Sequence, residues 1–112
     1  MICIWLIKKK KLQNHTKVYF NFFGYDESSY IDCEMECGSR AVDIHHIERR
    51  NKTKNDFIEN LVGLCRNCHI NCNDSSFNMY VRIKHLENVC MQVYALIELN
   101  KQLDENRKNR NK

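Results

Sequence analysis

The sequence predicts a small α+β domain in which two short strands and several helices are held together by clustered cysteines. The chain has 112 residues, the length of one domain, and 43% of them are apolar, which suits a packed core. Two short apolar runs lie between two closely spaced cysteine pairs. After the second pair, apolar residues recur in steps of three and four, which is the spacing of a helix.

The first 30 residues are expected to form a terminal flap and a short helix that pack on the core. The opening run MICIWLI is followed by four lysines, at positions 8–11. It is shorter than the roughly 20 residues of a membrane span and lacks the leading positive charge of a secretory signal. Residues 16–23 are rich in aromatic side chains, and we favour a helix ended by Gly24 over a strand.

Four of the seven cysteines form two pairs, Cys33-x3-Cys37 and Cys65-x2-Cys68. Two short-spaced pairs joined by an intervening segment are typical of a tetrahedral four-cysteine zinc site. Zinc binding would supply folding free energy, about 10–16 kcal/mol in small zinc fingers, that a core of this size needs. Clustered thiols of this kind indicate a reducing compartment, so we expect a cytoplasmic protein. Cys72 remains an alternative ligand.

The segment between and around the cysteine pairs, residues 31–74, is expected to be the core of the domain. Residues 40–47 read as a short strand, and residues 60–64, NLVGL, as a second one. Residues 48–56 are polar and charged, which predicts a loop between them. A short helix is expected to begin at Arg66.

Residues 75–103 are expected to form one long helix, for which Asp74, Ser75 and Ser76 offer capping oxygens. Its apolar residues alternate in steps of four and three, as in a coiled coil: Met79, Ile83, Leu86, Cys90, Val93 and Ile97. We favour a stripe that covers the domain's own core over one that pairs with a second copy in a homodimer. Residues 104–112 are expected to be a disordered basic tail.

Two histidines stand side by side in DIHHI, and a third histidine directly follows the last zinc-site cysteine. The segments CEMECGSRAVDIHHI and ENLVGLCRNCH resemble the HNH endonuclease family over residues 33–73. The resemblance implies a ββα-metal finger, two strands and a helix around a catalytic divalent ion, supported by a four-cysteine zinc knuckle. It implies a metal-dependent DNA endonuclease of phage or restriction type, which hydrolyses phosphodiester bonds by nicking or by double-strand cleavage.

The same resemblance assigns roles to four residues. His46 matches the general base that activates water, and His45 matches a metal ligand. Asn60 matches the central asparagine that orients the base or its loop, and His69 matches a further metal ligand. A neutral imidazole can accept a proton near neutral pH, which agrees with this assignment of His46.

The expected substrate is double-stranded DNA, and no membrane partner is expected. The formal net charge of +4 favours a polyanion only mildly. The arginines expected to contact phosphate are Arg40, Arg49, Arg50 and Arg66.

Two departures from the family pattern affect the metals. The first cysteine pair is one residue wider than the common form, and Asn73 stands where some relatives place another histidine. The expected catalytic ion is Mg²⁺ or Mn²⁺, with Zn²⁺ or Ni²⁺ as alternatives. The alternative function is a non-catalytic zinc finger that binds nucleic acid without cutting it.

Overall fold

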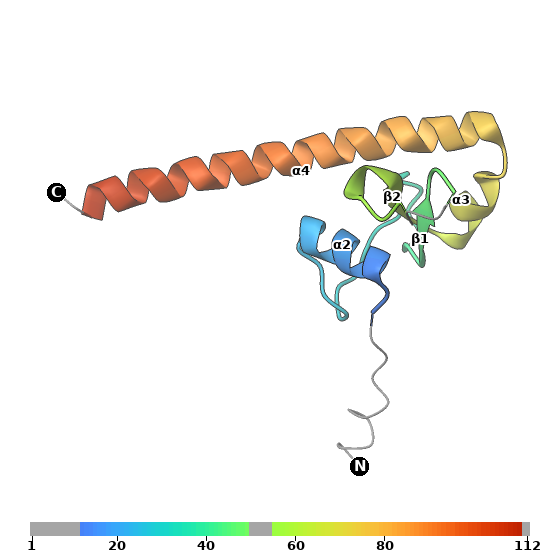
Figure 1. The fold of residues 1–112 in the computed structure, drawn as a ribbon, viewed down its shortest axis with the longest axis horizontal. Coiled ribbons are helices and arrows are strands. Elements are labelled where there is room, and N and C mark those ends of the chain that lie inside the picture. The colour runs from blue at the N-terminus through green and yellow to red at the C-terminus, as the bar shows by residue number, and fades with distance from the viewer. Residues whose placement is uncertain (1–11, 50–54, 111–112) are drawn as a thin grey trace, which may run out of the picture.

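The computed structural model describes residues 12–49 and 55–110 (Figure 1). Its elements are helix α2 (Asn14–Phe23), strand β1 (Asp43–His46), a 3-10 turn (Ile58–Asn60), strand β2 (Leu61–Leu64), helix α3 (Arg66–Asn71) and helix α4 (Ser75–Arg110). This is the small α+β fold that the sequence predicts. The predicted flap, the four lysines at positions 8–11 and Arg50 lie outside the described residues.

Strands β1 and β2 pair antiparallel, with Asp43 opposite Leu64 and His46 opposite Leu61. Successive side chains of a strand point to opposite faces, so Asp43 and His45 share one face and His46 lies on the other. All four residues of β2 are buried, because helices pack around this hairpin. The side chains of His45 and His46 therefore lie in two different environments.

Helix α2 packs closely against β2 at Gly63. A Cβ atom at Gly63 would lie 2.7 Å from the hydroxyl oxygen of Tyr19. Tyr19 is the buried residue of α2, and Gly24 ends the helix in the left-handed region at φ 75°. The predicted helix and its stop are confirmed, although the helix begins two residues earlier than residue 16.

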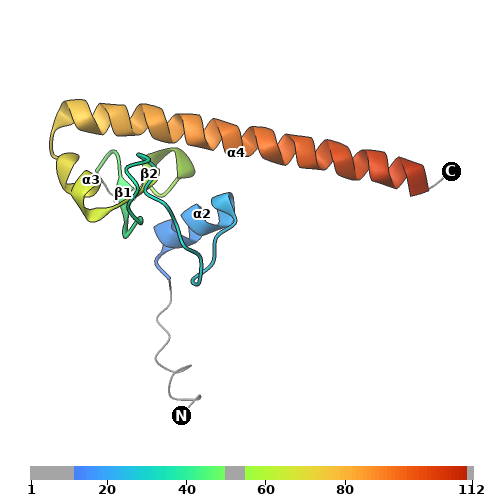
Figure 2. The same cartoon turned by 180° about the vertical axis from the view of Figure 1, so that it is seen from behind.

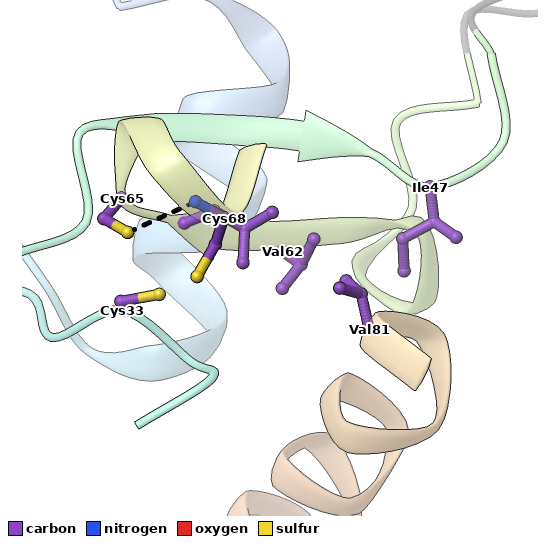
Figure 3. Packing of buried hydrophobic residues seen from close by; sticks show 7 residues of the cluster. Cys33, Ile47, Val62, Cys65, Cys68 and Val81 are labelled. Atoms are coloured by element: carbon purple, nitrogen blue, oxygen red, sulfur yellow. Dashed lines mark hydrogen bonds between the residues drawn. The ribbon is translucent and has the colours of Figure 1, made fainter. Parts of the chain in front are cut away.

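We call residues 33–71, which contain both strands and α3, the finger. The core combines cysteine sulfurs with aliphatic side chains from the finger and from α4. Figure 3 shows the sulfurs of Cys33, Cys65 and Cys68 converging beside Val62, with Ile47 and Val81 farther along the same core. Val81 comes from α4, so the long helix closes the core. Cysteine sulfurs and aliphatic side chains thus share one continuous interior.

Helix α4 begins where the sequence predicts, because the Asp74 carboxylate accepts a hydrogen bond from the backbone N–H of Phe77 at 3.0 Å. The expected core face of this helix is wrong, however. The residues of α4 that face the core are Val81, His85 and Val89, whereas Ile83 is 53% exposed and Ile97 49% exposed. The middle residue of the buried face is a histidine, so apolar spacing alone pointed to the wrong stripe.

The end of α4 also differs from expectation. Residues 104–110, expected to belong to a disordered tail, continue the helix to Arg110. This segment contains no glycine or proline, and its basic residues suit the negative end of the helix dipole. Asp104 also precedes Lys108 by one turn, a favourable helical spacing. Seen from behind, the last part of α4 extends well beyond the other elements (Figure 2).

Within residues 12–49 and 55–110, no helix combines the length and the apolarity that crossing a bilayer requires.

Candidate functional site

The four paired cysteines form one cluster. The sulfurs of Cys33, Cys37, Cys65 and Cys68 all lie within 4.8 Å of one another. The sulfur of Cys37 lies 3.6 Å from that of Cys65 and 3.9 Å from that of Cys68. A tetrahedral zinc ion with Zn–S bonds of about 2.3 Å holds its sulfurs about 3.8 Å apart. The four cysteines are therefore positioned to bind one metal ion, as predicted.

Local backbone structure forms this cluster from two short turns. The wide Cys33–Cys37 turn is accommodated by Glu36, whose φ of 57° lies in the left-handed region. Cys65 caps α3, and its sulfur accepts from the backbone N–H of Cys68 at 3.4 Å. The backbone N–H of Ser39 and the neighbouring thiols lower the pKa of Cys37 to about 6, which favours the thiolate that a metal needs.

Cys72 does not belong to the cluster. Its thiol donates to the backbone carbonyl of Cys68 at 3.4 Å, and the residue packs against the core. This removes the alternative ligand that the sequence left open.

A second pair of candidate metal ligands lies on the face of β1 that carries Asp43 and His45. The rings of His45 and His69 have centroids 4.9 Å apart. His69 donates through Nδ1 to the carboxylate of Asp43 at 3.0 Å. That contact leaves Nε2 of His69 with its lone pair, which is the usual arrangement of a metal-binding histidine.

The ring of His45 is also oriented by a hydrogen bond. Its Nε2 hydrogen-bonds the side-chain oxygen of Asn78 at 2.9 Å, and Asn78 is itself fixed by donating to the carbonyl of Ile47. Burial lowers the pKa of His45, and the neighbouring histidines lower it further. A neutral ring can present Nδ1 to a cation, so His45 and His69 fit the ligand chemistry of a divalent ion. Asp43 and Asn78 were not among the residues predicted from the sequence.

His46 has different partners from these two histidines. It donates through Nε2 to the carboxylate of Asp56 at 2.8 Å, and its ring meets the ring of His15 edge-on with centroids 5.0 Å apart. The side chain of His46 is 14% exposed and that of Asp56 is 6% exposed. The structure thus brings two of the three predicted histidines together and places the third against α2.

Asn60 fixes the loop that leaves β1. Its side-chain oxygen accepts from the backbone N–H of Glu48 at 2.7 Å. Its amide donates to the carbonyls of Glu48 at 3.1 Å and Asn55 at 3.2 Å. The residue is buried, and its side chain joins the loop backbone on both sides of the segment 50–54.

Of the four arginines predicted to contact phosphate, Arg40, Arg49 and Arg66 lie in the described residues. Arg66 reaches the carboxylate of Asp43 at 3.5 Å, beside His69. Arg40 stacks over the ring of Tyr30, and the backbone carbonyl of Arg49 accepts from Asn55. Arg66 is therefore the arginine best placed beside the candidate metal ligands.

A cavity of about 420 Å³ lies between α2 and β1. His15 and Tyr19 line it from α2, and Ile44 and His69 line it from the finger.

Residues 32–75 match the family model of the HNH endonuclease. This segment includes the cysteine cluster, both strands and α3, and the match confirms the resemblance and indicates a nuclease-related function. No curated protein and no solved structure matches the chain.

Proposed function

We propose, from the HNH endonuclease domain at residues 32–75, that the chain is a metal-dependent endonuclease that hydrolyses phosphodiester bonds in double-stranded DNA. The observation that carries this proposal is the pairing of His45 with His69, whose ring is fixed by Asp43. A zinc finger that only binds nucleic acid has no need of this carboxylate–histidine arrangement beside a second, thiolate site.

His45 and His69 would hold the catalytic divalent ion, through Nδ1 and Nε2 respectively. The ion supplies positive charge that polarises a phosphate oxygen and stabilises the departing oxygen. We propose Mg²⁺ or Mn²⁺ in this role. The imidazole ligands favour Mn²⁺ over Mg²⁺ and also admit Zn²⁺ or Ni²⁺.

His46 would serve as the general base. The hydrogen bond from its Nε2 to Asp56 leaves a lone pair on Nδ1, which can accept a proton from the attacking water. Asn60 would keep the following loop, and with it the end of β1, in place. Arg66, with Arg40, Arg49 and Arg50, would contact the phosphates on either side of the cleaved bond.

A plasmid-nicking assay tests this function. We expect the zinc-loaded protein to convert supercoiled DNA to nicked or linear DNA when Mn²⁺ or Mg²⁺ is added, and to stop when EDTA is added. The variant His46→Ala should cut at least about a hundredfold more slowly, the effect typical of losing a general base, while binding DNA with near-normal affinity. Lys17→Gln, at an exposed position of α2, is the matched control.

Two observations favour a non-catalytic binding module: the side chain of His46 lies on the face of β1 opposite the His45–His69 pair, and it is partly buried against His15 and Asp56. If the parent protein binds DNA but does not cut it with any of the four ions, the binding module replaces the endonuclease. If His46→Ala cuts as fast as the parent, the base is another residue.

We also propose that the protein acts in a reducing compartment such as the cytoplasm of a prokaryotic cell, because oxidation of its paired thiols would destroy the zinc cluster.

The partner at the exposed face of α4 is proposed to be a second copy of the chain, which would supply a second active centre for the other DNA strand.

A further inference from the structure

Three candidate ligands from three segments meet on the face of β1 opposite the His45–His69 pair. They are His15 from α2, His46 from the end of β1 and Asp56 from the loop before the 3-10 turn. One ligand atom from each lies within 4.8 Å of those of the other two. His15 belongs to a segment that precedes the family match, so the family resemblance does not account for it.

Each of the three side chains is held by a structured part of the chain. His15 lies one helical turn before Tyr19, which packs on Gly63, so both project from the same face of α2 toward the finger. His46 is fixed by the hairpin. Asp56 follows Asn55, whose carbonyl is bound by Asn60. The arrangement therefore arises from the fold, and chance surface proximity does not account for it.

The chemistry of the set suits a transition-metal ion. Two imidazoles and one carboxylate are typical zinc ligands, at about 2.0–2.2 Å from the ion and therefore about 3.3–3.6 Å from one another in a tetrahedral site. His46 Nε2 and Asp56 Oδ1 are hydrogen-bonded at 2.8 Å, so these two atoms need to separate by only about half an ångström or slightly more to hold one ion. Asn14 donates to the other carboxylate oxygen of Asp56 at 3.1 Å, an outer contact that would orient the ligand.

We propose that His15, His46 and Asp56 bind a Zn²⁺-class ion at a site separate from the cysteine cluster and from the His45–His69 pair. An ion at this site would bind Nε2 of His46 and the carboxylate of Asp56, which otherwise orients this ring. It also joins α2 to the finger through a metal bond. Occupancy would withdraw His46 from proton transfer. This last consequence, unlike the binding itself, rests on the proposed function.

A cobalt titration of the full chain, with its cysteine cluster already filled by zinc, tests the binding. Co²⁺ held by nitrogen and oxygen ligands gives visible bands without the charge-transfer absorption of thiolates, so the cysteine cluster does not interfere. His69→Gln removes the other histidine pair and is the background for all comparisons. In that background we expect one bound Co²⁺ per chain, and we expect His15→Gln to weaken it at least about tenfold.

Lys17→Gln, on the same helix, is the matched control and should leave Co²⁺ binding unchanged. Circular dichroism without added metal establishes that each variant is folded. Asp56→Asn, which keeps the size of the side chain, should weaken binding if His15→Gln fails to fold. Equal Co²⁺ binding by the His15→Gln or Asp56→Asn protein and the Lys17→Gln protein would overturn the site.

The regulatory consequence has a separate readout. Added Zn²⁺ should slow plasmid nicking by a larger factor in the parent than in His15→Gln, each compared with its own rate before zinc. Equal factors in the two proteins would overturn the inhibitory role. If neither protein cuts DNA, the proposed function fails, and the cobalt titration still decides whether the metal site exists.

Discussion

At the scale of single residues, the buried carboxylate of Glu34 connects more of the fold than any predicted site residue does. It accepts hydrogen bonds from the hydroxyl of Tyr19 at 2.6 Å, the backbone N–H of Gly63 at 2.9 Å and the imidazole of His85 at 2.7 Å. Asn88 donates a further hydrogen bond at 2.9 Å. One side chain thus joins α2, β2 and α4.

His85 is the histidine partner of Glu34, and it lies on the buried face of α4. The residue is fully buried, and its second ring nitrogen donates to the carbonyl of Ile58 at 2.6 Å. Burial alone would lower the pKa of His85, but the hydrogen bond and charge of Glu34 raise it. Burial would raise the pKa of Glu34, but the hydrogen bond and charge of His85 lower it.

These two shifts predict how stability depends on pH. Because the pKa of His85 is raised in the fold, its contribution is complete below its unfolded value of 6.5 and is lost as the pH rises through the folded value. Because the pKa of Glu34 is lowered, its contribution is present above its unfolded value of 4.5 and is lost as the pH falls. The pair therefore stabilises the fold most between these two unfolded values.

Urea unfolding of the zinc-loaded protein at several pH values measures this effect. Subtracting the stability of His85→Gln from that of the parent removes the titration of the other histidines and of the thiols. We expect the difference to be largest in the window between the two unfolded pKa values and to shrink above it. A difference that stays constant across the series would mean that His85 is neutral in the fold.

At the scale of elements, local signals in the sequence predicted where α2 ends and where α4 begins. Gly24 ends α2, and Asp74 caps α4, because capping depends on residues within one turn of the helix. The buried face of α4 could not be predicted in the same way. It depends on Glu34, which is 51 residues away from His85 in the chain. Cys90, predicted to lie in the core, is exposed for the same reason.

The residues of the candidate site also divide into those that local sequence predicts and those that depend on distant contacts. The cysteine pairs could be found from their spacing, because ligand spacing is a local property, and the three histidines from the family resemblance of the segments around them. Asp43 could have been found as the residue two before His45, on the same face of a strand. Nothing in the sequence placed His15 against His46, because that contact depends on how α2 packs around Gly63.

The turn between β2 and α3 depends on Cys65, which is both a candidate zinc ligand and the cap of α3. Replacing Cys65 with Ser should remove the bound zinc and lower thermal stability to the point where cooperative unfolding is lost, because binding free energy at such sites is folding free energy. Cys90→Ser, which replaces a thiol outside the cluster, is the matched control for bound zinc. Metal analysis measures the bound zinc of each variant, and thermal melting measures its stability. A Cys65→Ser protein that melts like the parent would exclude a zinc ion as the element that holds this fold together.

At the scale of the whole molecule, α4 is much longer than the domain it covers. Its 36 residues extend over about 54 Å at 1.5 Å per residue. Gln92 of α4 donates a hydrogen bond to the carbonyl of Phe22, near the end of α2, at 3.1 Å. Beyond that point the helix leaves the other elements (Figures 1 and 2). The segment still carries large exposed apolar side chains: Val93, Tyr94, Leu96, Ile97, Leu99 and Leu103.

An isolated helix of this kind is marginal in water, and contiguous exposed apolar surface marks an interaction site. The stripe predicted from the sequence, with its alternating steps of four and three, continues onto this exposed part through Val93 and Ile97. That period suits a coiled coil with the same helix of a second copy, in which each stripe covers the other. The stripe that failed to cover the chain's own core is therefore the surface on which we expect a homodimer to form.

Sedimentation equilibrium tests this assembly. The parent chain, of 13.5 kDa, should sediment at twice its mass, and Ile97→Lys should sediment as a monomer because it places a charge in the middle of the stripe. Gln102→Lys adds the same charge at an exposed position off the stripe and should remain dimeric. If the parent cuts both strands of a plasmid, Ile97→Lys should only nick it, because each copy carries one cysteine cluster and one His45–His69 pair. A parent protein that is monomeric at tens of micromolar would leave the exposed half of α4 to another partner and would exclude the paired arrangement.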